Sequence, residues 1–413
     1  MLRDNTYLTN RIATGLRWTA MGAGIDWQGF MSSEVFSSSV ILPGSCIGML
    51  GGGQLGRMSI LAGRRLGYRF RVFDPLPGGP AAMVADEDVN GAFDDVEALG
   101  RFAAGLHVAT LEFENVSKAA VEAVSAHAPV HPSAELLSVC QNRRREKIFF
   151  RDNGFPCVDF RVADTEESFR AAVDAVGLPC VAKTTSFGYD GKGQRKISAS
   201  GEIDSAWASF RGKEVIVEAW ADFEGEFSVI CSRNARGETS VFPVAENVHR
   251  NHILHTTVVP ARVPELMARE ALDLAHAIAE RSGLVGLLAV ELFLTAKGWL
   301  VNELAPRPHN SGHYSFDACA TSQFEQHIRA VCGLPPGDTR LFSPVAMVNL
   351  LGDLWSSKEP DWAGVLRHPR AKLHLYGKPT ARAGRKMGHV CVLGDSPESA
   401  LKEAVAIEAA LRA

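Results

Sequence analysis

The sequence of 413 residues lacks several patterns that would place it in a specialised class of proteins. Its eight cysteines include no C-x-x-C pair, which favours reduced thiols in a cytoplasmic protein over a disulfide framework. A formal net charge of -4 offers no basic footprint for nucleic acid. No apolar run is long enough to span a membrane, because Glu291 interrupts the longest candidate. The length suggests two or three domains, 46% hydrophobic residues allow a full core, and the composition agrees with a soluble enzyme.

The beginning of the chain carries no recognisable chemistry. Arg3, Arg11 and Arg17 occur there with few acids, as in a transit peptide, but no continuous apolar stretch precedes a small-residue cleavage site. We therefore expect no secretory signal. We interpret residues 1–44 as an extension that is disordered or precedes the native start, with Met31 as a plausible first residue.

The segment 287–304 predicts a β-hairpin that carries two facing carboxylates. Two apolar, strand-like runs are separated by a short turn that contains glycine. Pairing Thr295 with Trp299 would pair Glu291 with Glu303. Two buried carboxylates that face each other repel unless a cation lies between them, and oxygen ligands favour Mg²⁺. The alternative is that one of the two glutamates points to solvent.

Two polar loops indicate phosphate binding. Directly after the hairpin, the stretch 304–313 combines Arg307 with histidines and amide donors between two prolines, which is typical of a rigid anion-binding loop. Upstream, 186–194 contains three glycines whose backbone N–H groups can approach phosphate oxygens, with Lys192 supplying charge. This loop lacks the Walker A spacing and could be a plain β-turn. Together with the acidic hairpin, it indicates phosphates covered from one side and Mg²⁺ held from the other.

A dinucleotide-type glycine pattern stands near residue 50. A buried-strand run at 46–50 is followed by Gly51 to Gly56 in G-x-G-x-x-G spacing, a helix, and a second strand that ends at Asp74. This pattern makes an NAD-dependent enzyme the main rival interpretation. NAD binding would not explain the acidic hairpin, the second glycine-rich loop or the cationic stretch at 378–386. The same glycines could instead hold a substrate phosphate or ribose at the helix N-terminus.

Five motifs occur together in an order and spacing that resemble one known family. They are Gly51 to Met58, Glu112 to Val116, Gly188 to Gln194, Asn302 to Arg307 with His309 to His313, and Gly384 to His389. From about Cys46 to the C-terminus, the chain resembles the ATP-grasp ligases and, within them, the N5-carboxyaminoimidazole ribonucleotide synthetase family of purine biosynthesis. The two glutamates alone would indicate only the ATP-grasp superfamily.

This resemblance implies an α/β protein, α+β in the grasp region, with the ATP-grasp fold. The expected parts are the extension 1–44, an N-terminal Rossmann-like domain at 45–140, an ATP-grasp domain at 141–340 with a lid at about 155–219, and a small C-terminal domain at 341–413.

The resemblance also implies the site residues. ATP would be bound by Arg143, Lys183, Gly188, Tyr189, Asp190, Gly191, Lys192, Gly193, Gln194, Glu218, Ala219, Trp220, Ala221, Glu226, His249, Asn302 and Glu303. The substrate would be bound by Gln54, Leu55, Glu112, Asn310, Lys378, Arg385 and Lys386, with the last three on a 5′-phosphate. The catalytic candidates are Tyr189, Asp190, Lys192, Arg307 and His309, and Glu291 and Glu303 would bind Mg²⁺, for which Mn²⁺ is a possible substitute. Asp190 is either a base or a residue that only positions the backbone.

The activity implied is the ATP-dependent carboxylation of aminoimidazole ribonucleotide by bicarbonate, through carboxyphosphate, with closure of the 188–194 loop excluding water. A homodimer that passes its product to a separate mutase is expected. An ATP-grasp enzyme acting on glycinamide ribonucleotide with formate, and a non-catalytic nucleotide sensor, remain alternatives.

The spacing of the histidines also allows a zinc site, which we consider the weaker interpretation. His249, His252 and His255 recur every third residue, and His309 and His313 are four apart. The segment 248–258 is expected to run from a loop into a strand, where this spacing does not gather three imidazoles on one face. His252 stands where the family usually has glycine.

Overall fold

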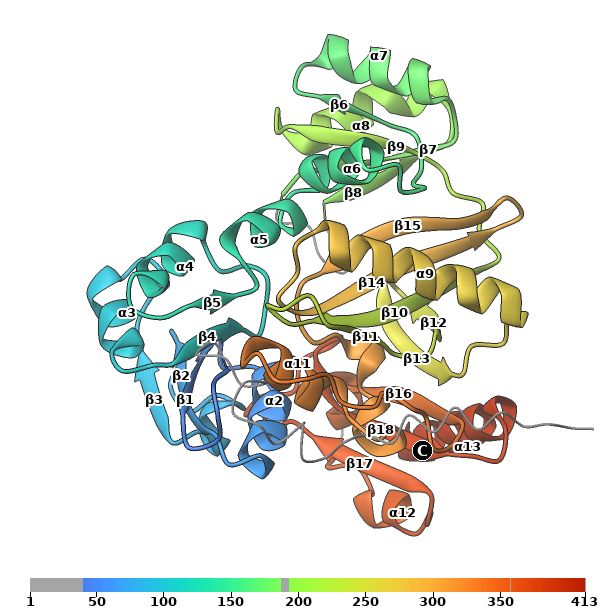
Figure 1. The fold of residues 1–413 in the computed structure, drawn as a ribbon. Helices are drawn as coiled ribbons and strands as arrows, with labels where there is room; N and C mark the ends of the chain where they lie inside the picture. The colour runs from blue at the N-terminus through green and yellow to red at the C-terminus, as the bar shows by residue number, and fades with distance from the viewer. Residues whose placement is uncertain (1–39, 187–192, 357, 413) are drawn as a thin grey trace, which may run out of the picture. The chain divides into compact units, whose positions relative to one another are not determined.

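The computed structural model describes residues 40–186, 193–356 and 358–412 (Figure 1). The predicted contacts at Gly188, Tyr189, Asp190, Gly191 and Lys192 lie outside the described residues, as does the extension up to residue 39. Of the helices in the described ranges, none is both long and apolar enough to cross a bilayer.

The N-terminal part is a parallel sheet whose strands are joined mainly by helices. Its elements are β1 (Cys46–Leu50), α2 (Gln54–Arg65), β2 (Arg69–Asp74), η1 (Ala82–Val84), β3 (Glu87–Asn90), α3 (Val96–Ala103), β4 (Val108–Leu111), α4 (Lys118–Ser125) and β5 (Val130–His131). The strands lie in the order β3-β2-β1-β4-β5. Parallel neighbours need a crossover connection, which explains the alternation of short buried runs with amphipathic helices. The predicted Rossmann-like arrangement is confirmed, with the glycine pattern at the turn from β1 to α2.

A smaller antiparallel sheet follows in the region of the predicted lid. The elements from here are α5 (Ala134–Cys140), α6 (Arg143–Asp152), β6 (Phe160–Ala163), α7 (Glu166–Val176), β7 (Cys180–Thr184), β8 (Gln194–Ile197), η2 (Ser200–Glu202), α8 (Ile203–Phe210) and β9 (Val215–Ala219). The strand order is β6-β9-β7-β8. Phe169 of α7 and Phe210 of α8 share a buried cluster with Val217 of β9, so both helices are fixed to the sheet by apolar packing.

The large sheet carries the site and takes up most of the remaining chain. Its region contains β10 (Gly225–Arg233), β11 (Thr239–Val241), β12 (Ala245–Arg250), β13 (Ile253–Val259), α9 (Glu265–Arg281), β14 (Gly286–Thr295), β15 (Gly298–Ala305), η3 (Asn310–Gly312), α10 (Ser315–Ala318), α11 (Gln323–Val331), β16 (Val345–Leu351), η4 (Gly352–Trp355), α12 (Trp362–Leu366), β17 (Ala371–Leu375), β18 (Lys386–Leu393) and α13 (Pro397–Arg412). The strand order is β15-β14-β10-β12-β13-β16-β18-β17, with β11 paired to β10. Helix α9 packs on β10, β14 and β15 through Ala271, Ala275 and Ile278 (Figure 1).

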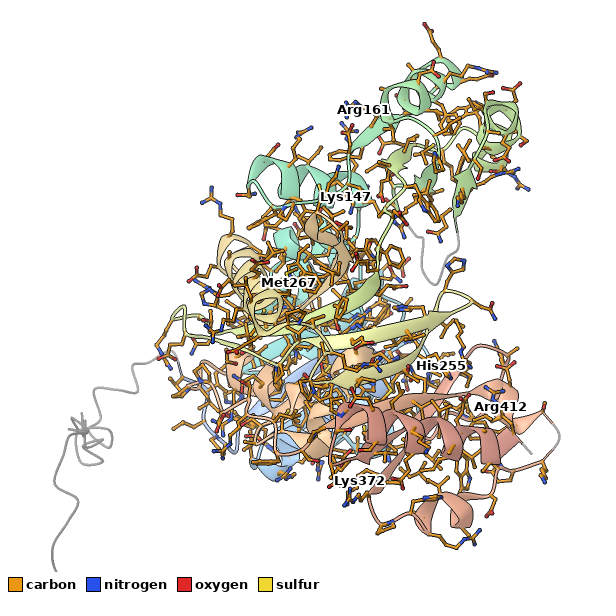
Figure 2. All side chains as sticks on the ribbon, turned by 90° about the vertical axis from the view of Figure 1, so that its right-hand side faces the viewer. Lys147, Arg161, His255, Met267, Lys372 and Arg412 are labelled. Atoms are coloured by element: carbon orange, nitrogen blue, oxygen red, sulfur yellow. The ribbon has the colours of Figure 1, made fainter. Side chains whose placement is uncertain are left out.

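The large sheet continues across the predicted boundary at residue 340. Strand β16 pairs with β13 in antiparallel register, with Thr256 opposite Val348. Helix α13 packs on the same strands, and His255 of β13 contacts Glu408, which also accepts from Arg412 (Figure 2). The C-terminal segment therefore extends the sheet of the ATP-grasp region, and the domain boundaries stay a prediction.

The hairpin of β14 and β15 confirms the predicted pairing of Glu291 with Glu303, although the register at its turn differs from the prediction. Thr295 pairs with Gly298, so the predicted pairing of Thr295 with Trp299 was wrong by one residue. A bulge at Asn302, between the pairs Leu292 with Val301 and Glu291 with Glu303, then shifts the ladder back. The shorter turn and the extra residue cancel each other, since each changes the register by one residue.

The segment 248–258 forms a hairpin, so the prediction that it runs from a loop into a strand was wrong. Strands β12 and β13 are joined at Asn251 and His252, which have φ values of 51° and 64°. Two positive φ angles are required by a type I′ turn, for which Asn-Gly is the usual sequence. The turn was not predicted because His252 stands where the usual sequence has glycine.

Candidate active site

One cavity of about 740 Å³ lies between the lid region and the large sheet. Its walls contain most of the predicted site residues that the structure describes. They are Arg143, Lys183, Gln194, Glu218, Ala219, Trp220, Ala221, Glu226, His249, Glu291, Asn302, Glu303, Arg307, His309, Asn310 and Lys386. Gly193, Gln54, Leu55, Glu112, Lys378 and Arg385 are not part of this lining. The cavity thus joins the predicted nucleotide, metal and catalytic residues, while the other predicted substrate residues lie apart from its walls.

Glu291 and Glu303 face each other across the hairpin at the cavity wall. Glu303 is exposed to the cavity, but desolvation at its depth in the protein and, second, the charge of Glu291 raise its pKa to about 7. Burial alone would also raise the pKa of Glu291, but the interaction with His309, whose Nε2 lies 3.2 Å from Oε1, lowers it. The pair therefore resists carrying two negative charges, which is the electrostatic condition that a divalent cation relieves. Within the described ranges, no group of three or more His, Cys, Asp or Glu side chains is arranged to hold a metal ion. A site of two carboxylates fits Mg²⁺, which completes its shell with water and phosphate oxygens.

The polar loop after β15 is held rigidly. Arg307 donates from Nε to Glu114 Oε2, and this pairing lowers the pKa of Glu114 to about 2 although burial opposes it. Gln323 accepts from the backbone N–H of His309 at 3.0 Å and donates to the carbonyl of His309 at 2.7 Å. Asn310 is 7% exposed, and among the described residues neither polar atom of its side chain has a hydrogen-bond partner. Because a buried amide without partners is costly, Asn310 is suited to contact a bound ligand.

The other end of the cavity combines buried charge with aromatic surface. Lys183 Nζ lies 2.6 Å from Glu218 Oε2, and both side chains are largely buried. Lys196 lies 3.7 Å above the ring of Trp220, which is 43% exposed. Exposed aromatic faces next to buried polar groups are suited to a nucleobase.

A second ion pair on the cavity wall crosses from β10 to β12. His249 Nδ1 lies 2.6 Å from Glu226 Oε2. Burial lowers the pKa of His249, but the Glu226 carboxylate outweighs this effect and the pKa is raised. Both partners of this pair are among the residues that the family resemblance places at the nucleotide.

The backbone N–H groups of the glycine loop before α2 already donate hydrogen bonds to carboxylates of the protein itself. Glu112 accepts from the N–H of Gly53 at 3.0 Å and of Gly56 at 3.2 Å, and Asp74 accepts from Gly52 at 2.7 Å. A Cβ at Gly53 would lie 2.2 Å from Glu112 Oε1, so a larger residue there would displace the Glu112 carboxylate from these amides. A dinucleotide pyrophosphate needs these amides, and NAD needs a free acid on its ribose. This arrangement argues against the NAD interpretation and against a substrate phosphate at the same amides.

The other predicted substrate residues, near this loop and in the segment 378–386, differ in how far they are available to a ligand. Leu55 is buried in a cluster with Tyr376 and is 7% exposed, so little of its side chain is open to a substrate. Burial is the main cause that lowers the pKa of Lys378 to about 8, with a further contribution from Arg385 and an opposing one from Glu112. Lys378 donates from Nζ to the carbonyl of Lys386 at 2.7 Å, and Arg385 donates to the Thr380 carbonyl at 2.8 Å. The three predicted phosphate ligands thus lie on one short segment, 378–386, that leads into β18 and concentrates positive charge.

Two buried ionisable residues on the cavity wall were missed by the sequence reasoning. Glu146 accepts from the N–H of Leu304 at 2.7 Å, and Lys147 donates to the carbonyl of Asn302 at 2.6 Å (Figure 2). Burial raises the pKa of Glu146 to about 8. Both residues fix the backbone of β15 on either side of Glu303. Their only signal in the sequence is an Arg-rich helix whose charges cannot all face solvent.

Comparison with protein families gives three matches along the chain. The ATP-grasp domain matches residues 148–324, the ribonucleotide synthetase preATP-grasp domain matches 45–141, and the phosphoribosylaminoimidazole carboxylase C-terminal domain matches 345–403. The N5-carboxyaminoimidazole ribonucleotide synthase of Bacillus subtilis is 44% identical over 368 residues, which are 89% of this chain and 96% of the relative.

This chain belongs to the N5-carboxyaminoimidazole ribonucleotide synthase family. The synthase of Brucella melitensis is also 44% identical, over 351 residues that cover 84% of this chain and 96% of the relative. A crystal structure of an N5-carboxyaminoimidazole ribonucleotide synthetase with ADP matches with a TM-score of 0.85 and 46% identity, covering 90% of this chain and 98% of that one. A structure of the Aspergillus clavatus synthase with ADP and 5-aminoimidazole ribonucleotide matches with a TM-score of 0.82 and 29% identity, covering 89% and 98%. These matches confirm the predicted ATP-grasp fold and the predicted ligase class.

Proposed function

We propose that this chain catalyses the ATP-dependent carboxylation of 5-aminoimidazole ribonucleotide by bicarbonate in purine biosynthesis, giving N5-carboxyaminoimidazole ribonucleotide, ADP and phosphate. The observation that carries the proposal is the pairing of Glu291 with Glu303 on the wall of the cavity that also contains Arg307 and His309. Membership of the synthase family selects this reaction among those that an ATP-grasp site could perform. The same membership disfavours the formate-dependent enzyme that acts on glycinamide ribonucleotide.

The chemistry begins with bicarbonate, which is a poor electrophile. An oxygen of bicarbonate attacks the γ-phosphorus of ATP, the bond to the β-phosphate oxygen breaks, and carboxyphosphate and ADP form. The exocyclic amine of the substrate then takes the carboxyl group, phosphate leaves, and the amine loses a proton. Arg307 and His309 are the proposed inner-site residues within the described part, together with Tyr189, Asp190 and Lys192 outside it.

Glu291 and Glu303 are the proposed ligands of Mg²⁺ in this account. Their facing carboxylates and the raised pKa of Glu303 fit a cation that would neutralise charge on the transferred phosphoryl group. Lys183 and Arg143 would contact ATP phosphates or adenine, and Glu218 to Ala221 would contact adenine. Glu226 would bind ribose hydroxyls, with His249 beside it.

The substrate is proposed to lie between the cavity and the N-terminal sheet. Lys378, Arg385 and Lys386 would bind its 5′-phosphate through charge-assisted hydrogen bonds. Glu112 would bind the ribose through lone pairs that Gly53 and Gly56 leave open. Gln54, Leu55 and Asn310 complete the proposed substrate contacts.

The proposal also includes a homodimer, a cytoplasmic location and transfer of the product to a separate mutase. All eight cysteines lie in the described part of the chain and are unpaired there, as in proteins of a reducing compartment.

An ATP turnover assay with three substrate conditions tests the function. Phosphate release with Mg²⁺ and bicarbonate is measured with 5-aminoimidazole ribonucleotide, with glycinamide ribonucleotide plus formate, and with neither. We expect rapid release only with the first. Release that depends on glycinamide ribonucleotide, or that requires no bicarbonate, would refute the proposal.

A further inference from the structure

A line of hydrogen bonds runs through the interior of the large sheet to the polar loop after β15. Thr257 Oγ1 donates to Asn247 Oδ1 at 2.9 Å, and Asn247 Nδ2 donates to Ser228 Oγ at 2.9 Å. Ser228 donates to Ser311 Oγ at 2.7 Å. These four residues come from β13, β12, β10 and η3, and none is more than 7% exposed. The line is therefore buried along its whole length.

The line ends on the imidazole of His309, whose two nitrogens have different partners. Ser311 Oγ lies 2.9 Å from His309 Nδ1, and the backbone N–H of Ser311 also points to Nδ1 at 3.4 Å. On the other side of the ring, Nε2 lies 3.2 Å from Oε1 of Glu291. One histidine thus connects the buried hydroxyl line to a proposed metal ligand.

The direction of each hydrogen bond determines the proton position on this ring. Asn247 uses its oxygen to accept from Thr257, so its nitrogen must donate to Ser228. Ser228 then has its own proton available for Ser311, and the proton of Ser311 is directed to His309. Nδ1 therefore accepts, and the proton of a neutral imidazole lies on Nε2.

Two contacts that do not depend on the orientation of the Asn247 amide require the same result. A backbone N–H can only donate, so the Ser311 N–H needs a lone pair on Nδ1. Glu291 presents a carboxylate oxygen to Nε2, and a lone pair there would be repelled. A reversed amide would place a proton on Nδ1 and violate both conditions.

We propose that Thr257, Asn247, Ser228 and Ser311 are positioning residues that hold His309 as the tautomer protonated on Nε2, donating to Glu291. In this state His309 orients one carboxylate oxygen of Glu291 and cannot accept a proton through Nε2. Its part in the reaction is that of a hydrogen-bond donor, which leaves the role of base to another group. The functional meaning rests on the proposed metal role of Glu291, whereas the tautomer itself does not.

The tautomer is measured by nuclear magnetic resonance on the full chain with ¹⁵N-labelled histidine and no ligand. Two-bond correlations between ring nitrogens and carbon-bound protons distinguish the two neutral forms, and loss of signals in His309→Gln assigns His309 among the 13 histidines. We expect a protonated Nε2 and an unprotonated Nδ1 near pH 7.5. A proton on Nδ1 would overturn the proposal, whatever the enzyme proves to carboxylate.

Ser228→Ala tests the line itself, because it frees the Ser311 hydroxyl from its donor. We expect the form protonated on Nδ1 to become populated and kcat to fall about 10- to 100-fold, as for other residues that orient metal ligands, with smaller changes in KM. Ser232→Ala is the matched control, since Ser232 is a buried serine of the same strand that hydrogen-bonds to Ser240 and Gln326 instead. An unchanged tautomer and kcat in Ser228→Ala would overturn the positioning role. Should this variant not fold, the tautomer of the wild-type protein still decides the assignment of His309.

Discussion

Glu303 carries a charge that the ligand-free protein disfavours and a bound cation would require. Desolvation and the neighbouring Glu291 raise its pKa to about 7, while the backbone on both sides is fixed by Glu146 and Lys147. These contacts hold the backbone of β15 in the position that places Glu303 opposite Glu291. A site held in this way is prepared for a cation before the cation arrives.

Glu303→Gln should abolish ATP turnover while the protein stays folded. Removing one of two facing carboxylates removes charge that Mg²⁺ needs but also relieves their repulsion, so the melting temperature should not fall. We expect at least about a 10²-fold loss of kcat, comparable to the loss of one group that stabilises a charged transition state. Near-normal turnover in this variant would exclude the metal role of Glu303.

Stabilisation by Mg²⁺ should depend on pH. Because the pKa of Glu303 is raised to about 7 from its ordinary value of 4.5, the folded ligand-free protein binds more protons than the unfolded chain between these values. The contribution of Glu303 to the free energy of unfolding therefore falls as the pH rises from 4.5 to about 7. Metal binding requires the ionised form, so the increase in melting temperature with Mg²⁺ should be larger near pH 8 than near pH 6. The difference should vanish in Glu303→Gln, and an equal shift at both pH values would contradict the assignment.

Arg385→Ala separates the substrate phosphate from the nucleotide. Loss of a charge-assisted hydrogen bond to phosphate costs roughly 1.5 to 3 kcal/mol, so the apparent KM for aminoimidazole ribonucleotide should rise about 10- to 100-fold. The KM for ATP should barely change. The substrate nucleoside without its phosphate serves as the control, because the variant should affect it much less. A rise in the KM for ATP instead would assign this loop to the nucleotide.

Residue types and order were enough to predict the glutamate pair and the cationic loop, but not the residues that support them. Glu146 contacts Leu304, which is 158 positions away in the sequence, and Arg307 pairs with Glu114 across 193 positions. Such partners are set by the tertiary packing of segments that are distant in the sequence. No local pattern in a single sequence contains that information.

At the scale of elements, the hairpin of β14 and β15 shows how a correct pairing can follow from an incorrect turn. The turn glycine and the apolar alternation predicted two strands, and both exist. The bulge at Asn302 had no signal, because a bulge requires only one extra residue of any type. The predicted pairing of Glu291 with Glu303 was therefore correct only because two errors cancelled. The turn is one residue shorter than predicted, and the unpredicted bulge adds one residue.

The turn between β12 and β13 holds His252 in a left-handed backbone conformation that is unfavourable for a residue with a Cβ. His252 has a φ of 64°, and a residue with a Cβ pays about 1 to 2 kcal/mol in this conformation. Glycine avoids this cost but loses about 0.5 to 1 kcal/mol through the freedom of the unfolded chain. His252→Gly should therefore raise the melting temperature slightly.

His252→Ala is the control for this prediction. Alanine removes the imidazole but keeps the Cβ, so it should not stabilise the protein. Thermal unfolding of the two variants distinguishes backbone strain from an effect of the imidazole. A glycine variant no more stable than the alanine variant would show that the turn is not strained.

At the scale of the whole molecule, the N-terminal sheet and the large sheet each supply one part of the proposed site. The N-terminal pattern predicted a nucleotide-binding loop, but Glu112 and Asp74 accept hydrogen bonds from its amides, and Glu112 comes from a segment 59 positions beyond Gly53. The fold class was predictable from the order of the motifs, while the extension of the large sheet through β16 was not. Sheet pairing between distant strands is decided by register and packing across the sheet.

The fate of the bicarbonate oxygen tests the account most directly. With ¹⁸O-labelled bicarbonate, ATP, Mg²⁺ and 5-aminoimidazole ribonucleotide, attack of bicarbonate on the γ-phosphorus transfers one labelled oxygen to the phosphate that is released. Mass spectrometry of that phosphate in a single turnover should find the label, together with stoichiometric carboxylated product. Unlabelled phosphate would mean that water attacks ATP and would contradict the proposed reaction.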